Sequence, residues 1–277
     1  MIDSHVHFWH RRGPHNYRII ERIAGMQHDF MPADLKPLAL PLGIDGVVVI
    51  EAAATLAETR DLLDMAEADP FVRGVVGWVD LASVDSGAAL AALAARPAFV
   101  GVRVQAQEKG ALGVLDDPAA RHGLDALARH GRALDLLVTP RQLGVATQFI
   151  RDHSELRIVL NHCGRPLVMT GELQPWADDM RRLARETGAF CKLSGLVERA
   201  LFEWQPADVE PYVLHLLDCF GPERLMFASN WPVSNLHSTY ARWWEALQAI
   251  LDRQGLSADE RRHLFETTAV RAYRLPP

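Results

Sequence analysis

Two histidines, His5 and His7, stand one residue apart in a short apolar run at the start of the chain. If the run is a β-strand, alternate side chains point to the same face, so the two imidazoles lie close together. Imidazole nitrogens in that arrangement suit a shared metal ion such as Zn²⁺. We interpret the pair as metal-binding or catalytic. The alternative is a pair of core histidines whose nitrogens are satisfied by neighbouring groups.

A third histidine, His162, ends another apolar run, and Gly164 just after it allows the backbone to turn sharply. One interpretation gives His162 a role in activating or orienting water. The other is a buried imidazole bonded to a backbone carbonyl.

Two cations, Arg103 and Lys192, also stand at the ends of apolar runs. A cation buried there needs an oxygen-rich partner, because burying an unpaired charge is costly. A substrate can be that partner, which would make both residues binding residues. Glu51 or Asp80, which end two other runs, can equally be a structural partner within the protein.

These polar residues share a position, at or near the end of a strand-sized run rich in Val, Leu and Ile. The runs recur at about the length of one strand-plus-helix repeat. They cover residues 2–8, 46–52, 74–80, 99–105, 133–138, 157–162, 189–194 and 225–230. Helical spacing is found between them in residues 55–68, 86–95, 118–130, 141–153, 175–187, 207–220 and 239–253, with 257–265 and 266–273 closing the chain.

The runs are almost continuously hydrophobic, as expected of parallel strands buried on both faces. Strands that alternate with helices in this number predict an α/β fold, a single-domain (β/α)₈ TIM barrel over residues 1–277. An open doubly wound sheet is less favoured, because no Gly-x-Gly-x-x-Gly follows the first run. Active sites in such barrels lie where the strands end, so the polar residues should meet there. The long connection 10–43 looks like a loop plus a short helix, and one interpretation is a flap over this site.

Composition narrows the class of protein. Hydrophobic residues make up 49% and charged residues 23%, which is ordinary for a soluble globular chain. A net charge of −6 argues against a nucleic-acid partner, and no apolar run approaches the ~18 residues of a membrane span. Three cysteines without a Cys-x-x-Cys, and no leader-like start, predict a reduced cytoplasmic protein.

Six stretches together carry a family resemblance. They are residues 2–9 (IDSHVHFW), 77–81 (GWVDL), 101–103 (GVR), 161–166 (NHCGRP), 191–196 (CKLSGL) and 220–233 (FGPERLMFASNWPV). In this order the chain resembles amidohydrolase family 2, in its branch of sugar-lactone hydrolases. The resemblance extends from end to end, and the stretches are specific only as a set.

The resemblance implies a (β/α)₈ barrel with a site built from the first-strand histidines, the sixth-strand histidine and an eighth-strand acid. It also implies that the second-metal ligands of the wider superfamily are missing. The fourth run offers Arg103 where a lysine would be needed, and the fifth offers no histidine. We therefore expect at most one divalent metal, with zinc as the candidate and His5 and His7 as its ligands. Some relatives in this branch look able to work without any metal.

One residue departs from the family pattern. The eighth-strand motif usually reads Ser-Asp-Trp-Pro, with the aspartate as general base or metal ligand, whereas this chain has Asn230. An amide can hydrogen-bond a water but cannot take a proton at neutral pH. If hydrolysis survives, His162, Glu51 or one of the paired histidines must supply the base.

These observations predict a hydrolase that opens the ring of a small sugar-acid lactone by attack of water on the ring carbonyl. His5 and His7, alone or through Zn²⁺, would polarise the carbonyl, while His162 activates water and Asn230 positions it. The expected substrate-binding residues are Glu51, Arg103, Arg165 and Lys192.

Other functions are less favoured. Asn230 leaves open a lactone isomerase or a catalytically idle barrel that binds a sugar acid. A decarboxylase, an activity of distant members of the family, would normally keep the aspartate. The expected partner is a small lactone or sugar acid, with no nucleic acid and no membrane. Phe202 and Trp204 leave room for a contact in a homo-oligomer.

Overall fold

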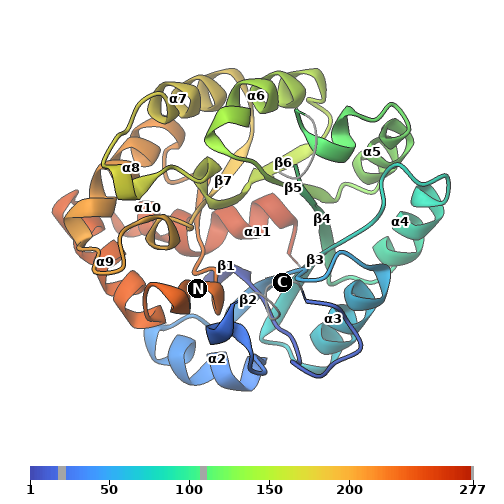
Figure 1. Cartoon of the computed structure of the whole chain (residues 1–277), viewed down its shortest axis with the longest axis horizontal. Coiled ribbons are helices and arrows are strands. Elements are labelled where there is room, and N and C mark those ends of the chain that lie inside the picture. The colour runs from blue at the N-terminus through green and yellow to red at the C-terminus, as the bar shows by residue number, and fades with distance from the viewer. Residues whose placement is uncertain (18–22, 107–110, 276–277) are drawn as a thin grey trace.

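The computed structural model describes residues 1–17, 23–106 and 111–275. Within these residues eight parallel strands form one sheet, in the order β1 to β8 (Figure 1). The strands are β1 Ile2–Val6, β2 Gly46–Ile50, β3 Val72–Gly77, β4 Phe99–Gln105, β5 Ala133–Leu137, β6 Arg157–Leu160, β7 Phe190–Leu193 and β8 Leu225–Phe227.

The first and last strands meet and close the sheet. Val6 forms a parallel bridge with Trp231, and the backbone N–H of Asn230 donates to the backbone carbonyl of His5 at 2.9 Å. The Ser4 hydroxyl also donates to the Phe227 carbonyl at 2.7 Å. The predicted (β/α)₈ barrel is therefore confirmed.

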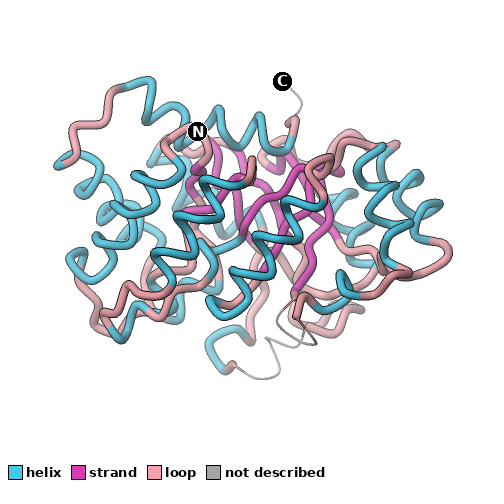
Figure 2. The backbone as a smooth tube through the Cα atoms, turned by 90° about the horizontal axis from the view of Figure 1, so that it is seen from above, coloured by secondary structure: helices cyan, strands magenta, loops and turns pink. Residues whose placement is uncertain are grey.

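Helices surround the strands on the outside, as the side view in Figure 2 shows. They are α2 Pro32–Ala39, α3 Leu56–Ala68, α4 Ser86–Ala94, α5 Ala120–Arg129, α6 Leu143–Asp152, α7 Trp176–Glu186, α8 Pro206–Phe220, α9 Tyr240–Arg253, α10 Ala258–Arg262 and α11 Thr268–Tyr273. Strand side chains are buried both against these helices and inside the barrel, so every residue of β2 is buried. None of the helices in the described residues is long and apolar enough to cross a membrane.

The last helix, α11, closes the amino end of the barrel and crosses its centre in Figure 1. Ala269, Ala272 and Tyr273 pack with interior strand residues such as Val48. The Tyr273 hydroxyl reaches Asp135 of β5, with an oxygen-to-oxygen distance of 2.8 Å. This end is filled by side chains, so the opposite end, where the strands finish, is the one that can hold a ligand.

Most of the strands are shorter than the sequence pattern predicted, whereas β4 covers the predicted residues 99–105. β3 runs from Val72 to Gly77 instead of 74–80, and β8 ends at Phe227 instead of residue 230. Asn230 has a left-handed backbone (φ 58), which a strand does not permit, so it lies in the loop after β8.

The helices predicted to close the chain are α10 and α11, and a π-helical turn, His263–Thr267, joins them. In the connection 10–43 the expected short helix is α2, and residues 18–22 lie outside the described part of the chain.

Candidate active site

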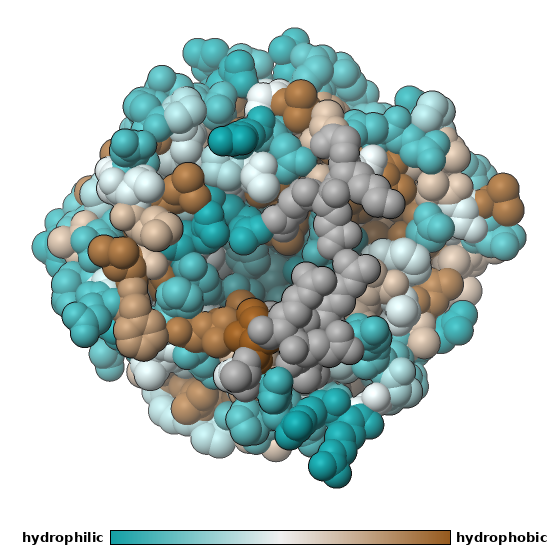
Figure 3. Space-filling view, viewed as in Figure 1, coloured by the Kyte–Doolittle hydropathy of each residue, from teal (hydrophilic) through white to brown (hydrophobic). Residues whose placement is uncertain are grey.

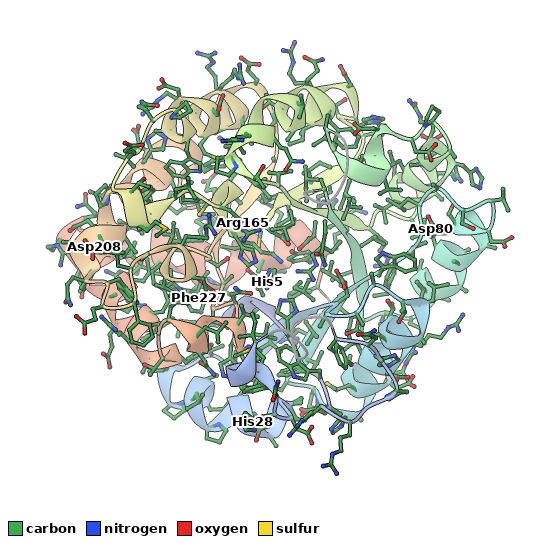
Figure 4. The ribbon with its side chains drawn as sticks, in the orientation of Figure 1. His5, His28, Asp80, Arg165, Asp208 and Phe227 are labelled. Carbon is green, nitrogen blue, oxygen red and sulfur yellow. The ribbon has the colours of Figure 1, made fainter. Side chains whose placement is uncertain are left out.

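A cavity of about 960 Å³ lies at the carboxyl ends of the strands. Figure 3 looks onto this face and shows a hydrophilic hollow at its centre, and in the same view Figure 4 places His5 and Arg165 centrally. The cavity wall includes six of the eight predicted site residues: His7, Glu51, Arg103, His162, Arg165 and Asn230. The structure thus brings most of them together.

His5 and His7 form one hydrogen-bonded chain with defined tautomers. The His7 Nδ1 lies 2.9 Å from the Ile50 carbonyl, which can only accept, so this nitrogen carries the proton and Nε2 is left bare. The His5 Nε2 lies 3.2 Å from the His7 Nε2 and must donate to it. The His5 Nδ1 then accepts from Lys192 Nζ at 3.2 Å.

The three site histidines are held neutral. Burial is the largest cause that lowers the pKa of His7, to about 3, and the charge of Arg103 adds to it. Burial and the Lys192 ammonium lower the pKa of His5 and of His162 well below the usual range. At neutral pH these imidazoles form hydrogen bonds but are weak proton acceptors.

A divalent metal does not fit the donor set well. Two imidazole nitrogens on one zinc ion would lie about 3.3 Å apart, close to the 3.2 Å between the Nε2 atoms of His5 and His7. However, the His5 Nε2 carries a proton while Lys192 occupies its other nitrogen. No group of three His, Cys, Asp or Glu side chains within the described ranges is placed to hold a metal. The residues present are thus an incomplete site, and we derive no catalytic step from a metal.

Arg103 is paired with Glu51 inside the cavity wall. Its Nε donates to Glu51 Oε1 at 2.7 Å, its guanidinium also donates to the Glu51 backbone carbonyl, and both side chains are buried. Glu51 Oε2 is buried without a hydrogen-bond partner among the described residues. Asp80, the other candidate partner, is exposed at the rim, away from His5 in Figure 4, and caps the backbone of Ala82.

Lys192 lies below the cavity, not in its wall. Its side chain is completely buried, with Nζ 2.6 Å from Asp135 Oδ2, and Asn161 also donates to that carboxylate at 2.8 Å. Among the described residues that line the cavity, neither Lys192 nor His5 is present. Lys192 is therefore not placed to contact a substrate in this cavity, contrary to the expectation from the sequence. The side chain extends into the barrel interior, where it neutralises Asp135 and orients His5.

His162 is held by an unusual turn after β6. His162, Cys163 and Arg165 all have left-handed backbones, with φ of 51, 42 and 57, a costly conformation that is concentrated at functional sites. The His162 Nδ1 lies 2.8 Å from the Ser194 hydroxyl. A Cβ on Gly195 would stand 2.4 Å from the His162 Cβ, so only glycine lets the turn approach this closely.

The sequence reasoning missed Glu198. This residue lies in a short 3-10 turn, Val197–Arg199, shortly after β7, and lines the cavity. Its Oε1 accepts from Asn230 Nδ2 at 2.6 Å. Burial raises the pKa of Glu198 to about 7, although the hydrogen bond from Asn230 and the charge of Arg165 act in the opposite direction. The sequence offered one indication that Glu198 lies near the site: it follows the family-like stretch 191–196 by two residues.

A (β/α)₈ barrel with a His-x-His pair on its first strand and another histidine after its sixth defines a class of barrel enzymes with their site at the strand ends. The chain belongs to the amidohydrolase family, whose sequence profile matches residues 2–275. The family expected from the motifs is therefore confirmed.

Individual relatives resemble the chain over nearly its full length. It is 38% identical to an L-fucono-1,5-lactonase of Burkholderia ambifaria, over 99% of this chain and 95% of that protein. An amidohydrolase of Burkholderia multivorans, solved with bound zinc, has a TM-score of 0.91 and 33% identity over 99% of both chains. A putative 2-pyrone-4,6-dicarboxylic acid hydrolase of Pseudomonas putida shares the fold, with a TM-score of 0.77 and 23% identity over 99% of this chain and 97% of the other.

Proposed function

We propose that this protein is a hydrolase that opens the ring of a small sugar-acid lactone by attack of water on the ring carbonyl. The observation that carries the proposal is the content of the cavity, where Arg103 and Arg165 share one wall with the neutral imidazoles of His7 and His162. Cations suit a carboxylate or hydroxyl-rich ring, and a neutral imidazole with a free N–H, as His162 can offer, suits a carbonyl. The similarity to an L-fucono-1,5-lactonase supports the same substrate class.

Each cavity residue has a place in this reaction. Negative charge develops on the carbonyl oxygen as water attacks, and Arg103 on the wall stabilises it. His162, whose Nδ1 faces the Ser194 hydroxyl, can donate a hydrogen bond from Nε2 to the same oxygen. The single N–H of His7 is already donated to the Ile50 carbonyl, so His7 shapes the cavity wall, while Asn230 positions the water. Glu51 keeps Arg103 in place and offers Oε2 to a substrate hydroxyl, and Arg165 binds the ring substituents. The cavity volume of about 960 Å³ accommodates a six-carbon lactone.

A panel of five- and six-membered aldonolactones tests the proposal, with acid release followed by a pH indicator. We expect hydrolysis above the spontaneous rate for at least one sugar-acid lactone. Binding of a sugar acid without hydrolysis of any lactone would favour the idle barrel instead.

The same panel of lactones tests whether the reaction needs a divalent metal. The protein is run after chelation and again after addition of Zn²⁺, with bound zinc counted per chain. Because the donor set is incomplete, we expect at most one zinc, on His5 and His7, and activity that survives chelation. Two zinc ions per chain would contradict this part of the proposal.

Gly195→Ala is expected to lower kcat/KM on the best lactone by about 10²-fold, because the added Cβ displaces His162 and small misplacements of this kind are costly. Steady-state kinetics and the circular dichroism spectrum check it together. Gly171→Ala is the matched control, since that glycine has a similar left-handed backbone (φ 68), has nothing within 4 Å and is exposed. Unchanged kinetics in Gly195→Ala would mean that the position of His162 does not matter for the reaction.

The predictions of a cytoplasmic location and of a homo-oligomer belong to this proposal. Phe202 is 72% exposed beside Leu201, which supports a contact surface at the rim. Trp204, expected to join it, is only 1% exposed, because the Arg242 guanidinium covers its ring at 4.5 Å. Trp204 is therefore too buried to take part in the proposed contact between subunits.

A further inference from the structure

We propose that Glu198 supplies the carboxylate that Asn230 lacks and takes the proton from the attacking water, an inference that rests on the proposed lactone hydrolysis. Asn230 occupies the position where the family resemblance implies an acid, and an amide cannot act as a base. The side chain that touches its amide nitrogen is a carboxylate. The pair therefore contains both groups that a bound water needs, one to orient it and one to deprotonate it.

The geometry of the pair leaves one carboxylate oxygen available. Asn230 Nδ2 donates to Glu198 Oε1 at 2.6 Å, across the loops that follow the neighbouring strands β7 and β8. Glu198 Oε2 is buried without a hydrogen-bond partner among the described residues. A buried acceptor without a donor is costly, and here the side chain stands in a cavity wall. A water or a proton at Oε2 would satisfy it.

The backbone holds Asn230 against this carboxylate. Its left-handed conformation (φ 58) suits asparagine better than most residues, and its backbone N–H is fixed to the His5 carbonyl at 2.9 Å. The amide side chain therefore meets Glu198 from a rigid position at the seam of the barrel.

Other acid–base groups in the described cavity wall are poorly suited to this role. His7 and His162 have lowered pKa values, since burial and nearby cations oppose their protonation. Glu51 is held by Arg103, and Asp80 is exposed at the rim. Glu198 has a pKa of about 7 because of burial, which is close to the optimum for a base at neutral pH.

Two cations, Arg165 and Arg199, and one neutral imidazole, that of His162, line the cavity together with Glu198. Arg165, in the turn after β6, lowers its pKa, and Arg199 is its neighbour in the same 3-10 turn. His162 shares the cavity wall and is held neutral. The two short helices that pack against this turn, Val168–Thr170 and Val233–Leu236, carry no titratable side chain. The charge of Arg165 and the hydrogen bond from Asn230 oppose the effect of burial, so a large part of the carboxylate is ionised near neutral pH.

The proton balance of the step is complete. The water oxygen forms a bond to the ring carbonyl carbon, one water proton goes to Glu198, and the carbonyl electron pair moves to its oxygen. The tetrahedral intermediate then breaks the bond between the former carbonyl carbon and the ring oxygen. Glu198 returns its proton to that ring oxygen, which becomes a hydroxyl, and the new carboxylic acid releases one proton to solvent. No oxidant or further reactant is needed.

Glu198→Gln is the first test. We expect kcat on the best lactone to fall by about 10²–10⁴-fold, the usual contribution of a general base, with little change in KM. The base must be ionised, so kcat/KM of the natural protein rises with pH and levels off above about 7, and this rise disappears in the variant. Glu203→Gln, an exposed glutamate in the following loop, is the control and keeps both the rate and the pH profile.

A swap of the two groups is the second test. Asn230→Asp alone places two carboxylates in contact, so we expect one of them to hold a proton and activity at neutral pH to fall. Glu198→Gln combined with Asn230→Asp restores one amide and one carboxylate, and should recover at least about 10-fold of the rate lost in Glu198→Gln alone. The double variant should also regain the rise of kcat/KM with pH, which a hydrogen bond restored for purely structural reasons would not produce.

Melting temperatures add a measurement independent of activity. A carboxyl group whose pKa is raised in the folded state lowers stability as pH rises from its ordinary pKa of 4.5 to the raised value of about 7, and the loss is complete above it. We therefore expect the Tm of Glu198→Gln at pH values above this range to equal or exceed that of the natural protein. A lower Tm would point to a structural role.

The outcomes separate the two proposals. If the natural protein hydrolyses no lactone, the proposed function falls and this inference falls with it. If the natural protein is active and Glu198→Gln keeps its rate and its pH profile, only the role of Glu198 is overturned.

Discussion

Lys192→Met is expected to lower the free energy of unfolding by about 3–5 kcal/mol, because it leaves a buried carboxylate without its cation. Lys192 Nζ lies 2.6 Å from Asp135 Oδ2, and both side chains have no exposed surface. Asn161 and Tyr273 continue to donate to Asp135, but neither carries a charge to compensate it. Chemical denaturation followed by circular dichroism measures the loss.

The double variant Lys192→Met/Asp135→Asn separates the missing charge from the missing packing. Removal of both charges should recover most of the lost stability, since a neutral amide at position 135 would need no counter-ion. Activity is expected to stay low in both variants, because the His5 Nδ1 loses the donor that sets its tautomer. A loss of less than about 1 kcal/mol in the single variant, the scale of a surface pair, would contradict the buried-pair interpretation.

Arg103→Met is expected to reduce kcat/KM by roughly 10- to 150-fold, which corresponds to about 1.5–3 kcal/mol for a lost hydrogen bond from a charged group. Arg103 lines the cavity and is the cation assigned to the developing oxyanion. The substitution also leaves Glu51 buried without its ion pair, so a loss of stability is expected as well.

Stability and catalysis can be separated at this site with a second substitution. Arg103→Met combined with Glu51→Gln removes the unpaired charge, and we expect it to restore stability but not activity. Arg103→Lys keeps the charge without the fork-shaped guanidinium, so its activity should fall between those of the natural protein and Arg103→Met. If Arg103→Met retains full activity and loses only stability, Arg103 serves the fold and not the substrate.

The contact at position 230 decides the effect of Asn230→Asp. Glu198 Oε1 lies 2.6 Å from Asn230 Nδ2, while Glu51 is engaged by Arg103. The effect of Asn230→Asp is therefore governed by a repulsive carboxylate pair.

The barrel itself was predictable from the sequence. Parallel strands buried on both faces are largely apolar, so β2 is an uninterrupted apolar run followed by Glu51, and β4 is apolar up to Arg103 near its end. Strand alternation also placed His5 and His7 on one face, and their Nε2 atoms are 3.2 Å apart. Most predicted strands extended too far, because polar residues just beyond a strand were counted with it, and β4 is the exception.

What only the tertiary structure decided is which polar groups meet and how deep they lie. Arg103 bonds Glu51 across 52 residues, Lys192 bonds Asp135 across 57, and Asn230 bonds Glu198 across 32. A local pattern tells which face of a strand a side chain takes, but not its depth along the barrel axis. Lys192 therefore resembles a cavity residue in sequence although it lies beneath the cavity. Glu198, in a loop with no periodicity, acquires its partner and its raised pKa only when neighbouring strands bring two loops together and exclude water from them.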